Sequence, residues 1–206
     1  MPNFLMYFLV ITVLPENGPD LPGIVTNISK VLNDSTADAN ILYKFQVVGE
    51  ATVIAVASAQ NNAAINRIVD RLWAVGKFKI SSQPIIPYES FAKNIGVSDD
   101  LTRPVGNILE PENIYWATLN VDYYNQTTNE LLDIWKAEAE TVLGARNNGD
   151  LRIVLFKNVA EREVTVFFNA PEPAQWDIDS FRLPLVDRIG SGVRISLKGV
   201  QFINDC

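Results

Sequence analysis

The sequence predicts an α+β fold made of two similar halves, each with the element order strand, helix, strand, strand, helix, strand. Two echoes within the chain lead to this prediction. Residues 6–13 (MYFLVITV) resemble 114–121 (IYWATLNV), and residues 48–56 (VGEATVIAV) resemble 159–167 (VAEREVTVF). The offset between the copies is 114 − 6 = 108 residues at the first echo and 159 − 48 = 111 at the second. A repeat of this length has the size of a domain and is too long for a solenoid unit.

The first half contains one signal for each expected element. Apolar, β-branched runs bounded by proline or glycine predict strands, and apolar residues at helical spacing behind a side-chain cap predict helices. In order, we expect a strand at 7–13, a helix capped by Asp20, a hairpin of 42–48 and 51–57, a helix capped by Asn61 or Asn62, and a strand at 79–86.

The second half repeats this order, and its first helix begins with a capping box, Thr127-x-x-Glu130. In order, we expect a strand at 114–121, that helix ending at 144–149, a hairpin of 152–156 and 163–168, a shorter helix opened by Asp177 or Asp179 and carrying Phe181, Leu185 and Ile189 on its apolar side, and a strand at 193–202. Pro184 lies inside the shorter helix and should shorten or break it. Trp73 and Trp135 lie on apolar helical stripes and are expected in the core.

A βαββαβ order in about 90 residues is the ferredoxin-like pattern. Its four-stranded antiparallel sheet carries two helices on one face and leaves the other face bare, which would expose a large apolar patch. We therefore expect the two sheets to pack face to face as an internal pseudo-dimer around a cavity. The first repeat is expected at 1–93, a linker at 94–112 and the second repeat at 113–206.

The composition is typical of a soluble globular protein and excludes several classes of partner. The net charge is −7, and no cluster of lysine or arginine provides the basic surface that nucleic acid requires. No stretch reaches the ~18 apolar residues of a membrane span. The apolar segment 4–14 lacks a positively charged start, so it predicts a strand and not a signal peptide. With a single cysteine, Cys206, an internal disulfide is excluded, and we expect a cytosolic location.

The absence of histidine restricts the chemistry further. It excludes Ser-His-Asp catalysis, histidine-ligated haem and histidine-based zinc or iron sites. Acid–base chemistry would fall to Asp, Glu, Tyr or Lys side chains or to the chain termini. We predict no metal and no cofactor.

Several segments together resemble the dimeric α+β barrels, and within them the muconolactone isomerase-like members. The segments are Tyr7 to Val10, Val47-Val48-Gly49, the Pro84-to-Phe91 ending of the first copy, and Leu183-Pro184-Leu185-Val186 followed by the strand at 193–197. The resemblance implies a barrel-like pair of sheets with a pocket between them, supplied here by one chain. That family includes isomerases, cyclases, decarboxylases, small monooxygenases, haem enzymes and proteins without known catalysis, so the fold does not select a reaction. The first strands of this chain also lack the arginine and acidic residue usual in the isomerases.

Alternation along the strands predicts which side chains face the space between the sheets. In residues 115–122, the odd positions are apolar and should lie under the helices, whereas Trp116, Thr118, Asn120 and Asp122 should face the other side. The third strand of the second copy contributes Glu163, Thr165, Phe167 and Asn169 to that side, where the first copy has Thr52, Ile54, Val56 and Ser58. The predicted cavity therefore has an apolar wall and a polar wall.

Asp122 and Glu163 are the candidates for a general acid or base, because a carboxyl group in an apolar pocket has a raised pKa. The expected substrate-binding residues are Phe8, Val10, Thr12, Trp116, Thr118, Asn120, Tyr123, Thr165 and Phe167. Alternatively, Asp122 is a solvated strand end and Glu163 only flanks a hairpin. Lys157 and Arg194 either bind an anionic group or are solvated.

These features favour a cofactor-free isomerase or cyclase acting on a small apolar or aromatic molecule. The alternatives are a carrier that binds such a molecule unchanged, and a protein whose sheets leave no cavity. The chain is expected to be a monomer with an internal pseudo-dimer, or a homodimer, without nucleic-acid or membrane partners.

Overall fold

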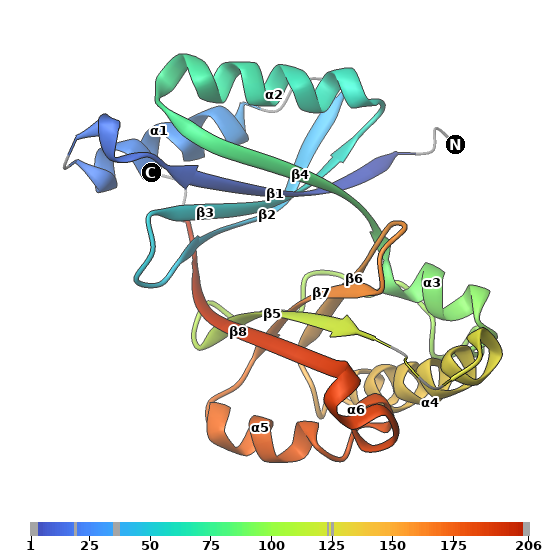
Figure 1. Ribbon diagram of the computed structural model, residues 1–206. Coiled ribbons are helices and arrows are strands. Elements are labelled where there is room, and N and C mark those ends of the chain that lie inside the picture. The colour runs from blue at the N-terminus through green and yellow to red at the C-terminus, as the bar shows by residue number, and fades with distance from the viewer. Residues whose placement is uncertain (1–3, 19, 35–37, 123, 125, 204–206) are drawn as a thin grey trace. The chain divides into compact units, whose positions relative to one another are not determined.

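The computed structural model describes residues 4–18, 20–34, 38–122, 124 and 126–203. The chain divides into two compact units (Figure 1). Unit 1 comprises Met1–Ile85 with Val200–Cys206, and unit 2 comprises Ile86–Gly199. Both are mixed α+β units with antiparallel strands, which confirms the predicted class.

Unit 1 follows the predicted order. Its elements are β1 (Leu5–Val13), the short 3-10 helix η1 (Pro15–Asn17), α1 (Leu21–Asn33), β2 (Ala39–Val47), β3 (Thr52–Ala59), α2 (Asn62–Val75) and β4 (Phe78–Pro87), which ends in unit 2. The strands are arranged β4-β1-β3-β2. The Asp20 side chain caps α1 by accepting from the Gly23 amide at 3.1 Å, and Asn61 caps α2 by accepting from the Ala64 amide at 3.0 Å.

Both helices of unit 1 cover the same face of its sheet. Strand residues that point to this face, such as Leu9, Ile11 and Val53, form one buried cluster with Ile28 of α1 and Leu72 of α2. Period-two alternation therefore places Phe8, Val10 and Thr12 of β1 on the opposite face.

Unit 2 has the same order of strands and helices after one additional helix. Its elements are α3 (Tyr88–Asn94), β5 (Ile114–Val121), α4 (Thr128–Asn147), β6 (Ile153–Asn158), β7 (Glu163–Asn169), α5 (Pro173–Ser180), α6 (Pro184–Ile189), the 3-10 helix η2 (Gly190–Gly192) and β8 (Val193–Phe202). The strand order is β8-β5-β7-β6. The predicted capping box is present at the start of α4.

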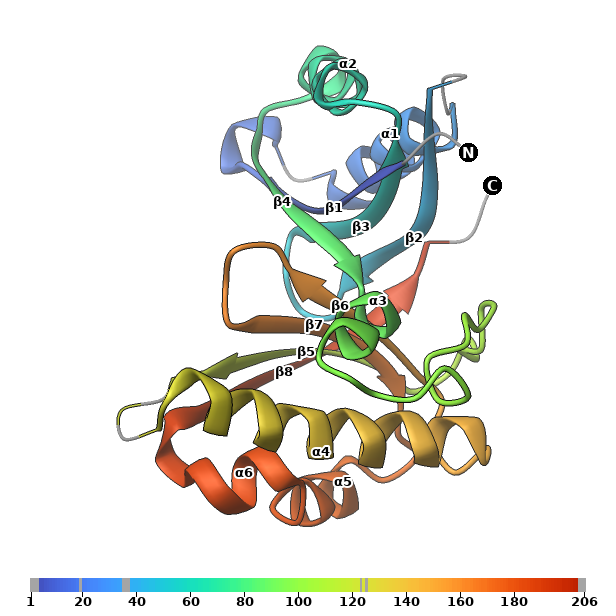
Figure 2. The same ribbon diagram turned by 90° about the vertical axis from the view of Figure 1, so that its right-hand side faces the viewer.

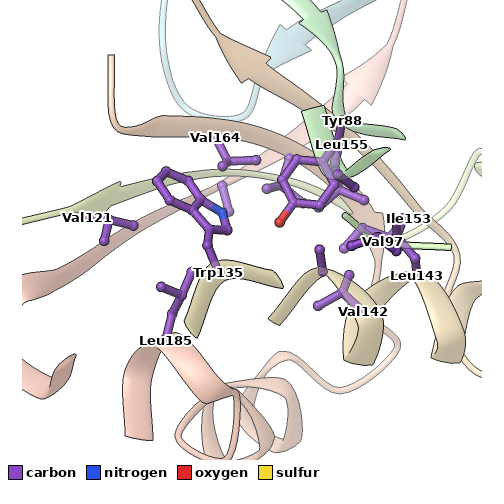
Figure 3. Close-up of a cluster of buried hydrophobic side chains, with 14 of the residues drawn as sticks. Tyr88, Val97, Val121, Trp135, Val142, Leu143, Ile153, Leu155, Val164 and Leu185 are labelled. Carbon is purple, nitrogen blue, oxygen red and sulfur yellow. The ribbon is translucent and has the colours of Figure 1, made fainter. Parts of the chain in front are cut away.

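The core of unit 2 lies between its sheet and its helices. Figure 3 shows Trp135 of α4, Tyr88 of α3 and Leu185 of α6 in one apolar cluster with strand residues such as Leu155 and Val164. Trp135 is buried as predicted. The contribution of α3 to this core was not predicted from the sequence.

Three other expectations were wrong. Trp73 is 55% exposed and Phe181 is 63% exposed, so neither belongs to a core. Asp177 and Asp179 do not open a helix; they lie inside α5, which starts at Pro173. Pro184 does break the segment as predicted, because it begins the separate helix α6.

The last residues of β8 pair with β2, Val200 with Val47 and Phe202 with Phe45, and belong to unit 1.

The repeat boundaries, the ferredoxin-like tandem and the face-to-face packing of the sheets stay predictions. In the described part of the chain, no helix is long and apolar enough to cross a membrane.

Candidate ligand-binding site

The sheet of unit 2 separates its side chains as the alternation predicted. Ala117 and Val121 of β5 are buried in the cluster under the helices, with Tyr115 and Leu119 packed against it. The residues between them, Trp116, Thr118 and Asn120, therefore point to the other face. The register of β5 and β7 places Asn120 opposite Glu163, Thr118 opposite Thr165 and Trp116 opposite Phe167.

A polar cluster occupies this face where β5, β6 and β7 approach the β6–β7 turn. The Asn158 amide nitrogen donates to Glu163 Oε1, and Thr165 Oγ1 donates to Asn158 Oδ1 at 3.0 Å. Asn120 also forms a side-chain hydrogen bond with Glu163. Thr165 is 1% exposed and Asn158 is 2% exposed. Buried polar groups are stable only when hydrogen-bonded, so these four side chains hold one another in place.

The net effect of its surroundings is to raise the pKa of the Glu163 carboxyl. Partial burial is the largest cause, and the neighbouring charge of Glu161 adds to it. The hydrogen bonds from Asn120 and Asn158 and the charge of Lys157 act in the opposite direction. Burial disfavours the ionised form, so the carboxyl is more often protonated than an exposed glutamate and can then donate a hydrogen bond.

Asn158 was missed by the sequence reasoning, although it closes the cluster. It lies at the end of β6, in the buried run Ile153–Asn158. A buried asparagine beside a predicted turn is usually interpreted as a turn residue, and only the cross-strand pairing shows that its side chain meets Glu163.

Asp122 makes contacts separate from those of Glu163. Its Oδ2 forms an ion pair with Arg194 at 2.9 Å and accepts a weak hydrogen bond from Tyr124 at 3.4 Å. It also lines an open hollow of about 410 Å³, together with Asn120 and the turn residues 160–162. The two predicted acid–base residues thus lie near the same end of the sheet, Asp122 half-buried and paired with an arginine and Glu163 in the polar cluster. Their catalytic roles stay predictions.

The aromatic side chains of this face differ in exposure. Phe167 is fully buried and contacts Phe156 edge-on, with ring centroids 6.4 Å apart. Trp116 is partly exposed, and the ammonium nitrogen of Lys198 lies 5.8 Å from its ring centroid. Trp116 therefore retains surface on which a planar molecule could stack.

The remaining candidates lie elsewhere. Phe8, Val10 and Thr12 are on the corresponding face of unit 1, where Thr12 pairs with Thr52. A cavity shared with unit 2 stays a prediction. Tyr123 lies outside the described residues.

Lys157 is neither solvated nor a free anion-binding group. It is 8% exposed and lies on the helix side of the sheet, with its ammonium nitrogen 5.5 Å from the ring centroids of Phe91 and Trp135. The same nitrogen donates to the carbonyl of Asn158 at 2.7 Å and to that of Glu161. Burial lowers the pKa of Lys157. The side chain fixes the β6–β7 turn that borders the hollow.

Solved structures share this fold. A chlorite dismutase variant from Candidatus Nitrospira defluvii matches with a TM-score of 0.61 over 98% of this chain and 92% of that chain, at 9% identity. A candidate chlorite dismutase matches with a TM-score of 0.57 over 95% of both chains, at 15% identity. A candidate monooxygenase from Lactobacillus acidophilus matches with a TM-score of 0.53 over 96% of this chain and 92% of that chain, at 11% identity.

The fold is that of the chlorite dismutase structures. No family model matches the sequence, and no curated protein matches it. Identities this low establish a shared fold and not a shared reaction.

The prediction of a cofactor-free isomerase or cyclase was wrong. The similar structures are named as chlorite dismutases and a monooxygenase, and not as isomerases or cyclases. The prediction rested on the expected cavity with one polar wall and on the short motifs of the resemblance, and these features describe the fold more than the reaction.

The family that the sequence resembles includes haem enzymes, but the residues of this chain do not suit that group. The chain contains no histidine. The described residues contain no group of three or more Cys, Asp or Glu side chains placed to hold a metal ion. The polar cluster offers amide, hydroxyl and carboxyl groups, which do not replace an imidazole ligand of haem iron. The face therefore does not fit a histidine-ligated haem.

Proposed function

We propose that this protein binds a small, largely apolar or aromatic molecule on the sheet face of unit 2 that lies opposite its helices. Glu163, Asn158, Asn120 and Thr165 would hold the polar group of the molecule. The observation that supports this is the hydrogen-bonded cluster around a carboxyl of raised pKa, next to an open hollow. Convergent polar groups beside apolar surface are typical of small-molecule sites.

The chemistry of the cluster favours a ligand with an oxygen acceptor. A protonated Glu163 donates a hydrogen bond, and the Asn120 amide can donate a second. Trp116 lies on the same face, four residues before Asn120, and offers a surface for an aromatic body. A phenol, an aromatic amide or a similar carbonyl compound matches this arrangement. Asp122, which lines the adjacent hollow, would contact the same ligand.

The proposal also includes the origin and setting of the site. We infer that the two units are tandem copies of one ferredoxin-like βαββαβ unit, of which only the second retained or acquired the polar cluster. Monomeric or homodimeric assembly and a cytosolic location remain part of this inference.

Binding of three probes, phenol, benzamide and cyclohexanol, tests the proposal. The change in melting temperature and the quenching of tryptophan fluorescence are measured for the wild type and for Glu163→Met and Asn120→Leu, which each remove the hydrogen-bonding group. A ligand that binds only the folded state raises the melting temperature. We expect phenol or benzamide to bind and cyclohexanol to bind more weakly. Each substitution should raise the dissociation constant about tenfold, which corresponds to the loss of one hydrogen bond to a polar group.

The matched control is Glu140→Met, which makes the same chemical change at an exposed position of α4. It should leave the dissociation constant unchanged. Equal affinity in the wild type and Glu163→Met, or no binding of any of the three probes, would contradict the proposed site.

A further inference from the structure

A second buried carboxyl lies on the other side of the unit 2 sheet. Glu138 of α4 is only 4% exposed. Its Oε2 accepts a hydrogen bond of 3.0 Å from the amide of Leu185 in α6. Among the described residues, no lysine or arginine forms an ion pair with it. A buried carboxyl without a cation is costly and therefore calls for an explanation.

Glu138 borders a small chamber between the sheet and the helices. The chamber has a volume of about 50 Å³. Its walls are apolar side chains such as Leu119 and Leu155 of the sheet and Trp176 and Val186 of α5 and α6. Each water-sized group needs roughly 10–15 Å³ of such volume, so the chamber holds about three to five non-hydrogen atoms.

The chamber arises from the broken helix of unit 2. In unit 1, the continuous helix α2 presses Ala64, Ile65, Ile68 and Leu72 onto the sheet. In unit 2, Pro184 separates the corresponding segment into α5 and α6, each with a single buried residue, Ser180 and Leu185. Figure 2 shows these two short helices beside α4. Two short helices fill less of the layer than one long helix, which leaves space beside Glu138.

The charged groups around the chamber do not neutralise Glu138. Tyr88 of α3 is the other titratable side chain in the wall, and its pKa is raised by burial and by the charge of Glu138. The charged residues of the covering elements, Asp177, Asp179, Asp187, Arg188 and Arg194, are exposed. Lys157 of β6 is bound to the turn carbonyls and to the Phe91 and Trp135 rings.

We propose that this chamber is a second binding site, for a short-chain primary ammonium ion whose nitrogen contacts the Glu138 carboxylate and whose alkyl group occupies the apolar walls. Ethylammonium, with three non-hydrogen atoms, matches the volume. The ammonium ion supplies the positive charge that the protein does not place there. The hydroxyl oxygen of Tyr88 interacts with the Trp135 side chain and has a second lone pair that can accept a hydrogen bond from the same nitrogen.

The proposed site has a defined pH dependence. Burial raises the pKa of Glu138 from 4.5 to about 7, against the effect of the Leu185 hydrogen bond. Only the ionised carboxylate attracts an ammonium ion, and alkylammonium ions stay protonated well above this pH. Affinity should therefore increase as pH rises to about 7 and level off above it.

The test uses ethylammonium chloride on the intact protein, with sodium chloride at equal concentration as the salt control. Binding is followed by the NMR resonance of the Leu185 amide, the hydrogen-bond donor to Glu138. At pH 8.5 ethylammonium should shift this resonance with saturation. At pH 5.5 the dissociation constant should be about 30-fold higher, because only about 3% of the carboxyl is then ionised.

Glu138→Gln removes the charge and keeps an oxygen acceptor for the Leu185 amide, so the variant should fold, as circular dichroism would show. It should lose ethylammonium binding at every pH, whereas Glu140→Gln should behave as the wild type. Tetraethylammonium chloride, which exceeds the chamber volume, should not bind. Equal affinity in Glu138→Gln, equal affinity at both pH values, or no shift in the wild type at pH 8.5 would each overturn the proposal. None of these results depends on the cluster around Glu163.

Discussion

Units 1 and 2 have the same strand register but differ in the polarity of their interiors. Thr12 pairs with Thr52 in unit 1 at the place where Asn120 pairs with Glu163 in unit 2. Beside them, Ile54 in unit 1 occupies the place of Thr165. The same backbone frame thus carries a mostly apolar face in one unit and a hydrogen-bonded polar cluster in the other.

The difference extends to the interior as a whole. Of the buried polar residues in the described part of the chain, unit 1 contains Ser29 and Thr52, and unit 2 contains Thr102, Glu138, Arg146, Lys157, Asn158, Thr165 and Ser180. Buried polar groups reduce stability unless each is bonded. The interior of unit 2, where both proposed ligand sites lie, is therefore more polar than that of unit 1.

The largest predicted effect is a pH dependence of the free energy of unfolding, caused by the buried Glu138 of unit 2. The pKa of Glu138 is raised from 4.5 to about 7 in the folded state, so folded protein holds this proton more tightly than unfolded chain. The stabilisation is complete below pH 4.5 and is lost as pH rises through 7. As pH rises between these limits, the free energy of unfolding should therefore fall by about 3 kcal/mol. Urea unfolding at pH 5 and pH 8, followed by tryptophan fluorescence, measures it.

The control for this prediction is Glu138→Gln, in which the contribution should disappear while that of other groups remains. A wild type and variant with the same difference in unfolding free energy between pH 5 and pH 8 would show that Glu138 is ionised and compensated in the fold.

A second prediction concerns one position on the sheet face, where each unit is given a side chain of the type found in the other unit. Ile54 is fully buried, and Ile54→Thr removes apolar volume and buries a hydroxyl without the asparagine partner that Thr165 has in unit 2. The free energy of unfolding should fall by about 2 kcal/mol. The reciprocal change, Thr165→Val, leaves Asn158 Oδ1 without its donor and should cost about 1 kcal/mol. Chemical unfolding compares the pair, and a smaller loss in Ile54→Thr than in Thr165→Val would contradict the contrast.

The sequence was sufficient for the frame of both units because that frame depends on local signals. The capping side chains Asp20 and Asn61 and the capping box at Thr127 all form as expected. Alternation along β5 correctly separated the side chains under the helices from those on the other face. These features are encoded over a few residues, so they can be recognised without knowledge of distant contacts.

The features that define the polar groups are not local. Asn158 meets Glu163 only because β6 and β7 pair, and Glu138 meets Leu185 across 47 residues of sequence. Trp73 has the spacing of a core residue, but its side chain is exposed on α2, because helical periodicity alone does not show where the covered stripe ends. The reaction was predicted wrongly for the same reason: fold-level motifs do not specify a site.

The buried Lys157 side chain should stabilise the β6–β7 turn, and this can be tested by substitution. Its ammonium group bonds two turn carbonyls, whereas unit 1 has Gln46 at the corresponding position. Lys157→Met keeps the length of the side chain and removes these charged hydrogen bonds, so the free energy of unfolding should fall by about 1.5 kcal/mol. Gln46→Met should change it by less than about 0.5 kcal/mol. An equal effect of both substitutions, measured by urea unfolding, would remove the special role of Lys157.

The smallest predicted effect lies in the two hairpin turns. Gly49 in unit 1 has φ = 76°, and Ala160 at the corresponding position in unit 2 has φ = 64°. Glycine adopts this left-handed conformation freely, whereas a Cβ atom makes it unfavourable by roughly 1 kcal/mol. Gly49→Ala should therefore lower the free energy of unfolding by about 1 kcal/mol, since the added Cβ meets no neighbouring atom and only the backbone conformation is affected.

Ala160→Gly should act in the opposite direction and stabilise unit 2. The gain should be below about 1 kcal/mol, because glycine also increases the conformational freedom of the unfolded chain. Ala160 borders the hollow beside the polar cluster, so the same variant shows what the strained turn contributes to binding. If a rigid turn orders the site, Ala160→Gly raises the melting temperature and weakens the affinity for phenol or benzamide; if both stability and affinity increase, the strain has no part in recognition.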